Sequence, residues 1–326
     1  QVTTLGIIAG AGAMPVAVAD GAVRSGMAAH LFCIADELPL GVERHPYESI
    51  PLGSLGLLLR SLRRAGCREI CIIGSIRRPD LGKLKLDAGA LVSLPTILRL
   101  MIGGDDSVLS RVVRFFERKG FVVRGAHEIA PELVVGSGVL GRIRPSRGQL
   151  TDIDLGMRVA GELGRLDVGQ GAVVSRGHVI AVEAAEGTDR MLARCGELRQ
   201  WGRQRRRRSG VFVKRAKPGQ ELRIDMPVIG EETVRRAADA GLAGIAVRAG
   251  EVMIADRART IAVADETGLF LVVSMTGRQR GDEVSAWLHD IAAQPLRLFI
   301  VAGEHSGDRL GGRLLEELQQ RCSGQL

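Results

Sequence analysis

Aromatic side chains are scarce in this chain, at 3% of 326 residues, with one tyrosine and two tryptophans. Proteins that hold exposed bases stack them on aromatic rings, so this scarcity disfavours a nucleic-acid partner. Long apolar runs are missing as well. The longest candidate, 88–98, is bounded by Asp87 and Arg99, and no run reaches the 18 residues that a transmembrane helix needs.

Metal-binding and disulfide patterns are also lacking. The five cysteines include no CxxC pair, and the six histidines show no HxxxH spacing. An odd number of unpatterned cysteines is not a disulfide framework, so a reducing cytoplasm is expected. Cys67 and Cys71 flank and begin an apolar run, which predicts two small buried side chains.

Positive charge is concentrated in one segment. The formal net charge is +8, and nine basic residues with no acidic one lie between 198 and 220. A local basic segment can bind nucleic acid, an anionic membrane or a phosphorylated ligand, or form a solvated loop. Lys214, Arg215 and Lys217 follow an apolar stretch and are therefore better placed for a site than Arg203–Arg208.

The first 130 residues alternate strand-like with helix-like segments. Strands are expected at 3–9, 29–35, 69–74 and 121–124, and helices at 14–26, 52–65, 86–101 and 106–120. This alternation predicts an α/β fold, with a parallel sheet covered by helices on both faces. Ligands of such sheets bind at the carboxyl ends of the strands.

The domain boundary is expected near residue 135, where the chain is rich in Gly, Val, Pro and Ser. Residues 136–275 again mix both types, with helices at 151–163, 187 onward, 230–240 and 257–266, and strands at 172–174, 178–183, 211–214, 244–247, 252–254 and 269–274. A second α/β domain follows from this mixture. Residues 276–326 hold a linker, one strand (296–302) and one helix (310–320), which is too little to bury a core.

A glycine-rich turn, Gly10-Ala11-Gly12, stands between the first strand and the first helix. Glycines and free N–H groups at a helix start favour a phosphate, although a tight turn without a ligand has the same pattern. Pro15 replaces the third glycine of the dinucleotide fingerprint, and Asp36 could imitate its ribose-binding acid. Ser75 ends the third strand at the same edge of the sheet, as a ligand contact or an ordinary cap.

Two further segments carry polar groups. Thr188 is expected to cap the helix from Gly187, which suits either a phosphate or simply a well-capped helix. Asp225 stands between apolar residues in a basic stretch. A carboxylate in such a place is paired, metal-bound or catalytic, and a salt bridge to Arg223 or Lys214 is the structural alternative.

Four segments carry a resemblance to a known family: 5–15 (LGIIAGAGAMP), 167–174 (DVGQGAVV), 182–189 (VEAAEGTD) and 212–230 (FVKRAKPGQELRIDMPVIG). They resemble the UDP-2,3-diacylglucosamine pyrophosphatases of lipid A biosynthesis that are not calcineurin-like metallophosphoesterases. The resemblance covers about 5–275. It implies an N-terminal Rossmann-like domain (1–135) and a C-terminal catalytic α/β domain (136–275), with the lipid product held between them.

The resemblance also implies a reaction. Water attacks the β-phosphorus of UDP-2,3-diacylglucosamine and gives 2,3-diacylglucosamine 1-phosphate and UMP, with Mg²⁺ required. Asp225 matches the family's important aspartate, so it is expected to bind Mg²⁺ or accept the proton of water. Lys214 is expected to hold a phosphate oxygen. The expected substrate-binding residues are Gly12, Ala13, Ser75, Gln170, Thr188 and Asp189.

The implied partners are a glycolipid nucleotide substrate, the inner-membrane surface reached from the cytoplasm, and a second copy of the chain in a homodimer, with no nucleic acid. The segment 298–308 (LFIVAGEHSGD) resembles the first strand and turn of lipid A disaccharide synthase. Only the opening unit of that enzyme is present, so residues 276–326 are predicted to be an inactive remnant.

Three alternatives remain at this point. A nicotinamide- or flavin-dependent oxidoreductase could use the glycine turn, but the missing third glycine weakens this reading. A nucleic-acid-binding protein could use the arginine run, with a steep salt dependence. A lipid or nucleotide carrier would bind the same ligand without hydrolysing it.

Overall fold

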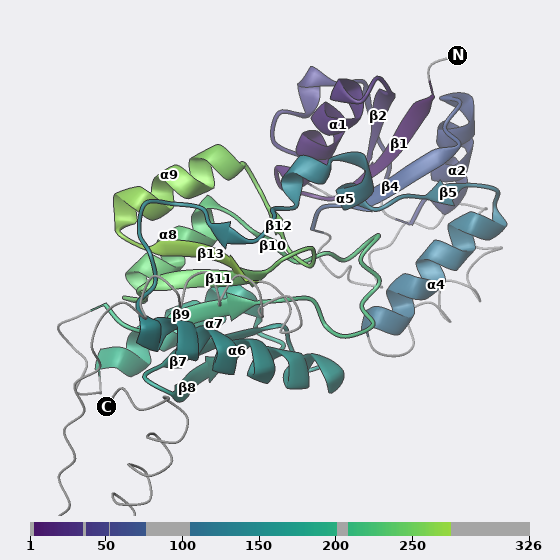
Figure 1. The fold of residues 1–326 in the computed structure, drawn as a ribbon. Helices are drawn as coiled ribbons and strands as arrows, with labels where there is room; N and C mark the ends of the chain where they lie inside the picture. Colours follow the sequence, from purple (N-terminus) through teal and green to yellow (C-terminus); the bar gives the residue numbers. More distant parts are fainter. Residues whose placement is uncertain (1–2, 35–36, 52, 76–104, 201–207, 275–326) are drawn as a thin grey trace, which may run out of the picture. The chain divides into compact units, whose positions relative to one another are not determined.

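The structure is a computed structural model that describes residues 3–34, 37–51, 53–75, 105–200 and 208–274 (Figure 1). These residues belong to the first of two units of the chain, Gln1–Thr276 and Gly277–Leu326. Several predicted features lie outside the described residues: Asp36, the helix expected at 86–101, most of the arginine run, and the strand and helix expected in the tail. Within those ranges, no helix is long and apolar enough to cross a membrane.

The first sheet is entirely parallel and has the strand order β3-β2-β1-β4-β5. Its strands are β1 (Thr4–Ala9), β2 (Ala28–Cys33), β3 (Tyr47–Ser49), β4 (Glu69–Ile73) and β5 (Val122–Val123). The helices that follow or connect them are α1 (Met14–Arg24), η1 (Val42–Arg44), α2 (Leu55–Arg64), α4 (Asp105–Arg118), α5 (Ala126–Ile129) and η3 (Pro131–Leu133). This order is that of the Rossmann fold.

Side-chain alternation along β1 builds a core on each face of this sheet. Leu5 and Ile7 pack on the α1 and α5 side, whereas Ile8 packs on the α2 and α4 side. Gly6 faces α2, and a Cβ there would come within 2.6 Å of the Leu62 side chain. A strand buried on both faces needs this nearly continuous apolar sequence.

The second sheet is mixed, with the order β6-β13-β11-β9-β7-β8. Its strands are β6 (Gly138–Val139), β7 (Gly171–Ser175), β8 (His178–Val182), β9 (Val211–Lys214), β11 (Gly244–Arg248) and β13 (Phe270–Ser274). Strands β9, β11 and β13 run parallel to one another, while β6 and β7 pair antiparallel with their neighbours β13 and β9. The carboxyl ends of β8, β9, β11 and β13 therefore lie at one edge of the sheet, beside the start of β7.

Four helices cover the second sheet: α6 (Arg147–Arg165), α7 (Gly187–Gln200), α8 (Glu231–Asp239) and α9 (Arg257–Thr267). Helix α6 packs on one face, through Ile153 and Met157, and the other three pack on the opposite face. A small parallel pair, β10 (Val228–Ile229) and β12 (Met253–Ile254), completes the described elements.

The predicted α/β class is confirmed, and most of the expected strands and helices are present within a few residues of their predicted ends. Strands β3, β6 and β10 and the short helix α5 were not predicted. Met226 and Met253, from the second half of the sequence, are buried in the same core cluster as Leu5 and Ile7 of β1. The division at residue 135 into separate domains stays a prediction.

Candidate active site

The turn that follows β1 is locked to the end of β4. The backbone N–H of Ala11 donates to the Ser75 carbonyl at 2.8 Å, and the N–H of Ser75 donates to the Ala11 carbonyl at 3.0 Å. Gly10 and Gly74 approach so closely that a Cβ on Gly10 would lie 2.6 Å from the Gly74 carbonyl carbon. The two glycines of this contact are therefore required by packing rather than by a ligand.

Gly12 and Ala13 follow this turn and are exposed. Gly12 has a φ of +100°, and Ala13 is the N-cap of α1 without a side-chain cap hydrogen bond. The N–H groups at such a helix start are available to an anion. The structure thus brings three predicted residues, Gly12, Ala13 and Ser75, to the carboxyl end of the first sheet.

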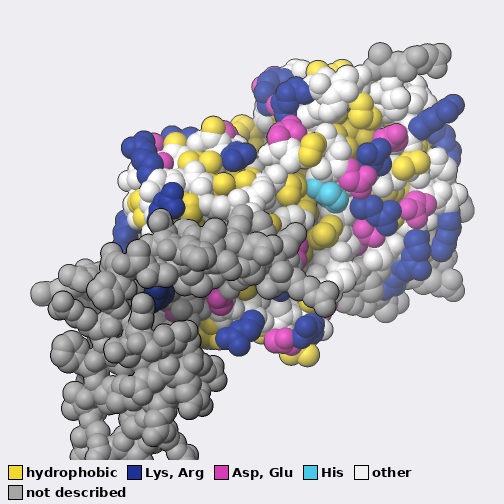
Figure 2. Space-filling model, viewed as in Figure 1, with side chains coloured by type: hydrophobic (Ala, Val, Ile, Leu, Met, Phe, Trp, Pro, Cys, Tyr) yellow, Lys and Arg dark blue, Asp and Glu magenta, His cyan; other side chains and the backbone are white. Residues whose placement is uncertain are grey.

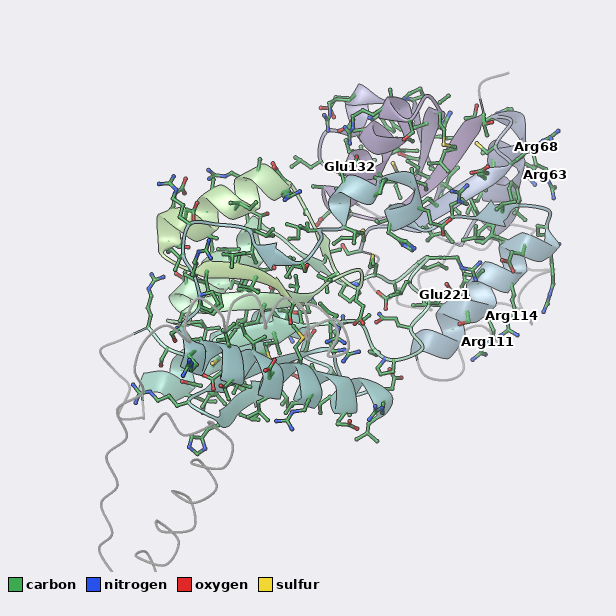
Figure 3. The ribbon with its side chains drawn as sticks, in the orientation of Figure 1. Arg63, Arg68, Arg111, Arg114, Glu132 and Glu221 are labelled. Carbon is green, nitrogen blue, oxygen red and sulfur yellow. The ribbon has the colours of Figure 1, made fainter. Side chains whose placement is uncertain are left out.

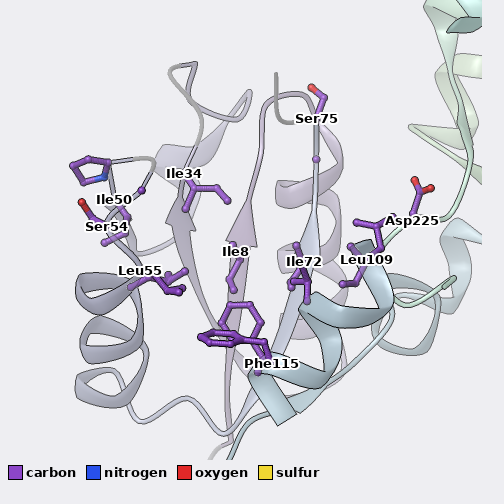
Figure 4. Close-up of a pocket in the computed structure, with 17 residues that line it drawn as sticks. Ile8, Ile34, Ile50, Ser54, Leu55, Ile72, Ser75, Leu109, Phe115 and Asp225 are labelled. Carbon is purple, nitrogen blue, oxygen red and sulfur yellow. The ribbon is translucent and has the colours of Figure 1, made fainter. Parts of the chain in front are cut away.

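An apolar pocket of about 640 Å³ lies beside this edge (Figure 4). Ile8 and Ile72 of the sheet, Leu55 of α2, and Leu109 and Phe115 of α4 are among the described residues that line it. Ser54, Ser75 and Asp225 also line the pocket and bring polar groups to a mostly apolar wall. The volume is in the range of small-molecule sites in proteins.

Asp225 reaches this pocket from the segment between β9 and β10. One carboxylate oxygen, Oδ2, accepts a hydrogen bond from Gln220 Nε2 at 2.5 Å. Gln220 is itself fixed, because its Oε1 accepts from the backbone N–H of Lys217 at 2.8 Å. The alternative salt bridge to Arg223 is absent, since the Arg223 guanidinium bonds Glu221 and Glu117 instead.

Lys214 is the last residue of β9 and is only 7% exposed. Its Nζ donates to Thr188 Oγ1 at 3.0 Å and to the Val228 carbonyl at 3.3 Å. Burial lowers the pKa of the ammonium group, while the negative charges of Glu183, Asp189 and Asp225 oppose that shift. Asp225 and Lys214 therefore influence each other electrostatically without a direct ion pair.

Thr188 lies inside α7, one residue after its start, so its predicted role as the helix cap is wrong. Its hydroxyl donates to Glu183 Oε1 at 3.0 Å and accepts from Lys214. Glu183 follows the end of β8 directly, and the turn after it leads into α7 at Gly187, so that Thr188 comes within hydrogen-bond distance of Lys214. Thr188 thus joins a lysine and a carboxylate that are 31 positions apart in the sequence.

Two of the acidic side chains near Thr188, Glu186 and Asp189, form ion pairs with arginines. Glu186 pairs with Arg194 at 2.8 Å, and Asp189 pairs with Arg236 at 3.4 Å. Gln170 precedes β7 and, among the described residues, its buried Oε1 has no hydrogen-bond partner. The second sheet thus brings Gln170, Thr188, Asp189 and Lys214 to one edge.

Sequence reasoning missed two members of this site, Glu183 and Gln220. Both lie in segments already singled out by resemblance, 182–189 and 212–230. There, Glu183 counts only as one of three acidic residues, with Glu186 and Asp189, that would repel an anion unless a divalent cation bridged them, and Gln220 has no predicted role. What identifies them is their burial in the folded chain, where the Glu183 side chain is 6% and the Gln220 side chain 7% exposed. A polar side chain buried that deeply usually has a partner or a task.

The first sheet is Rossmann-like and has a turn suited to phosphate, and the mixed sheet has a buried lysine. Both sheets carry polar groups at the carboxyl ends of their strands. The protein is therefore an α/β protein of the class that binds ligands at this edge. Comparison with known proteins narrows this class. Residues 4–133 match the protein-family model described as the LpxI N-terminal domain, and residues 136–272 match the LpxI C-terminal domain.

A curated relative from Caulobacter vibrioides, named UDP-2,3-diacylglucosamine pyrophosphatase LpxI, is 44% identical over 269 residues. The aligned region covers 82% of this chain and 96% of the relative. The chain belongs to the LpxI family. The resemblance found in the sequence is thereby confirmed over nearly all of the described residues.

Proposed function

We propose that the protein is a UDP-2,3-diacylglucosamine pyrophosphatase that acts in lipid A biosynthesis and releases 2,3-diacylglucosamine 1-phosphate and UMP. The observation that carries this proposal is the 44% identity to the pyrophosphatase of Caulobacter vibrioides across 96% of that enzyme. The joining of a phosphate-suited turn, an apolar pocket and a buried lysine in one compact unit supports it.

In the proposed reaction, water forms a bond to the β-phosphorus, and the bond from that phosphorus to the bridging oxygen breaks. The bridging oxygen leaves with UMP. We assign Asp225 as the group that binds Mg²⁺ or accepts the proton from water, and Lys214 as the cation that holds a phosphate oxygen. A cation is needed because the diphosphate repels an incoming nucleophile.

The residues around Asp225 are compatible with Mg²⁺. Among the described residues no group of three His, Cys, Asp or Glu side chains forms a metal site. Mg²⁺, however, is commonly bound by one or two carboxylates together with substrate phosphates, and one oxygen of Asp225 is left over after the bond to Gln220. When bound, the ion would neutralise phosphate oxygens and lower the pKa of its water.

The apolar pocket suits the acyl part of such a substrate. Its lining is mostly aliphatic and aromatic, and Ser54, Ser75 and Asp225 are the polar side chains among the described residues that line it. An acyl chain in the pocket would leave the phosphates next to the Asp225 carboxylate. Gly12 and Ala13 are assigned to the same ligand through their backbone N–H groups, while Gln170, Thr188 and Asp189 are assigned to the sugar and phosphate side.

The inner-membrane surface and a homodimer are proposed as partners. A lipid-linked substrate has to be taken from a bilayer, and the exposed sides of α2 and α4 offer cations for this contact. The edge strand β8 of the second sheet, with Val179 44% exposed, supports self-association because an unpaired edge invites another strand.

Replacement of Asp225 tests the proposed reaction. We expect Asp225→Ala and the isosteric Asp225→Asn to lower UMP release by about 10²–10⁴-fold, the usual contribution of a group that moves a proton. Substrate binding, measured by calorimetry, should persist. Glu132→Gln is the matched control, because Glu132 pairs with Arg24 on the surface (Figure 3). Normal turnover by either Asp225 variant would remove Asp225 from the reaction.

The position of water attack can be measured separately. In ¹⁸O-labelled water with Mg²⁺, the label should enter the sugar phosphate if the β-phosphorus is attacked, and UMP if the α-phosphorus is attacked. A bound ligand that is never hydrolysed would instead favour a carrier.

A further inference from the structure

Glu183 is a carboxylate buried without an obvious structural reason. Its side chain is 6% exposed, and among the described residues Oε2 has no hydrogen-bond partner. Two glycines make room for it: a Cβ on Gly169 would lie 2.0 Å from the Glu183 carbonyl oxygen, and one on Gly171 would lie 2.5 Å from Oε2. Burying an ionised carboxylate is costly, so the surrounding segments are built to retain this one.

The hydrogen bonds from Lys214 to Glu183 have a fixed direction. A threonine hydroxyl has a single proton, and the Thr188 proton is donated to Glu183 Oε1 at 3.0 Å. The Thr188 oxygen is therefore left as an acceptor for Lys214 Nζ, also at 3.0 Å. Without an acceptor at Glu183, Thr188 would be free to turn its proton elsewhere and to release the ammonium group.

Three carboxylates interact with the charge on Lys214: Glu183 after β8, Asp189 on α7 and Asp225 from the segment after β9. Asp189 is exposed and pairs with Arg236, and Asp225 bonds Gln220 and borders the pocket. Glu183 alone among the three is buried. Its charge is the one least screened by solvent and least altered when a ligand binds near Asp225.

We propose that Glu183 is a positioning residue, which acts through Thr188 to hold the Lys214 ammonium group, in its charged form, at the carboxyl end of β9. This inference rests on the proposed function, because it assigns Lys214 to a substrate phosphate. It also changes the expected part of Thr188, whose hydroxyl serves the lysine rather than presenting a donor to the substrate.

The test is the pH dependence of kcat/KM in Glu183→Gln, a variant of nearly the same volume without the charge. Loss of the anionic neighbour lowers the pKa of Lys214 further, so the ammonium group is lost at a lower pH. We expect the alkaline limb of the profile to move down by about one pH unit or more, and turnover at pH 8 to fall by roughly 10–100-fold.

Thr188 supplies a second pair of variants in case Glu183→Gln does not fold. Thr188→Ser keeps the hydroxyl and should leave the alkaline limb where the parent protein has it, whereas Thr188→Val breaks the link and should move the limb down as Glu183→Gln does. The double variant with Thr188→Val should be little worse than Thr188→Val alone, because Glu183 acts on Lys214 through that hydroxyl. Independent, multiplying losses would contradict the inference.

Asp152→Asn is the matched control. Asp152 is another buried carboxylate of the same half, but it accepts from the N–H groups of Arg176 and Gly177 in the β7–β8 turn, at the other end of the sheet. This variant should lower Tm and leave the alkaline limb unchanged. A purely structural Glu183 would behave in the same way, and that result would overturn the inference.

A measurement that needs no substrate separates this inference from the proposed function. With ¹³Cε-labelled lysine, the NMR titration of Lys214, assigned from Lys214→Arg, should occur at lower pH in Glu183→Gln than in the parent protein. An identical titration overturns the role of Glu183. Failure of the parent protein to hydrolyse UDP-2,3-diacylglucosamine would overturn the proposed function alone.

Discussion

Gly171 lies opposite Lys214 in the antiparallel pairing of β7 with β9. The space that a side chain would occupy at Gly171 is filled by the carboxylate of Glu183. Phe212 closes the same space, 2.9 Å from the position of a Cβ. At the scale of single residues, the site therefore depends on a glycine that touches no ligand. The two glycines of the DVGQG segment (167–171), Gly169 and Gly171, are required because Glu183 packs against both of them.

Gly171→Ala is expected to displace the Glu183 carboxylate and to destabilise the fold by about 1–3 kcal/mol, as overpacking of a filled core does. UMP release should fall together with Tm. Gly148→Ala is the control, because Gly148 lies in α6 with nothing near its Cβ, and alanine there should raise stability by about 0.5–1 kcal/mol. Thermal unfolding and turnover of both variants check this. Normal turnover in Gly171→Ala would contradict it.

Some single residues could be predicted and others could not. Asp225 and Lys214 stood out because a carboxylate between apolar residues and a lysine after an apolar strand are unusual in sequence. Glu183 did not stand out, because its burial depends on two glycines 12 and 14 positions earlier that become its neighbours only when β7 and β8 pair. Thr188 was predicted to be a cap because its contacts with Glu183 and Lys214 also exist only in the folded chain.

At the scale of elements, α2 and α4 have two distinct sides. Their apolar sides line the pocket through Leu55, Leu58, Leu109 and Phe115. Their outer sides and the adjoining turns carry six exposed cations that have no acidic partner among the described residues: Arg60, Arg63, Arg68, Arg114, Arg118 and Lys119. Figure 2 shows Lys and Arg along this edge, and Figure 3 labels Arg63, Arg68 and Arg114 there.

These cations predict binding to an anionic bilayer. Each Lys or Arg near such a surface contributes about 1 kcal/mol, so replacing Arg60, Arg63, Arg114 and Arg118 by Gln should weaken binding to phosphatidylserine vesicles by about a hundredfold or more. The same replacement of Arg144, Arg147, Arg158 and Arg257, all exposed on the second half, is the control. Co-sedimentation measures both. Equal binding of the two variants would exclude α2 and α4 as the docking side.

The longer elements were predictable, as were the two-residue strands β5 and β12, but β3, β6 and β10 were not. Strands β1, β2 and β4 are nearly continuous apolar runs, which is the pattern of a strand covered on both faces. Strands β6 and β10 have two residues each, and β3 has three, too few for any periodicity to be seen. They form because a neighbouring strand edge is available, which is a property of the folded chain.

At the scale of the whole molecule, residues Gln1–Thr276 form a unit separate from Gly277–Leu326. A chain that ends at residue 276 is therefore expected to keep its Tm and to release UMP within about twofold of the full chain, because the contacts that define the unit are retained. Thermal unfolding and the turnover assay check this. A large loss of either would show that residues beyond 276 contribute to the fold or to the reaction.

The overall class could be read from the alternation of strands and helices, but the arrangement of the second half could not. Its elements also alternate, yet β6 and β7 run antiparallel to the parallel strands β9, β11 and β13. Hydrophobic patterns report which faces are buried and do not report strand order or direction. The pocket was equally hidden, since its lining comes from segments as distant as Ile8 and Asp225.

The core shared by β1 and Met253 has a consequence for synthesis of the protein. Residues emerge from the ribosome in order, so Leu5 and Ile7 are made about 250 residues before the methionine that completes their cluster. Until then, the first sheet exposes an apolar surface that Met226 and Met253 will later cover. A nascent chain stalled before residue 226 should accordingly bind chaperones, and its release should follow the appearance of those two side chains.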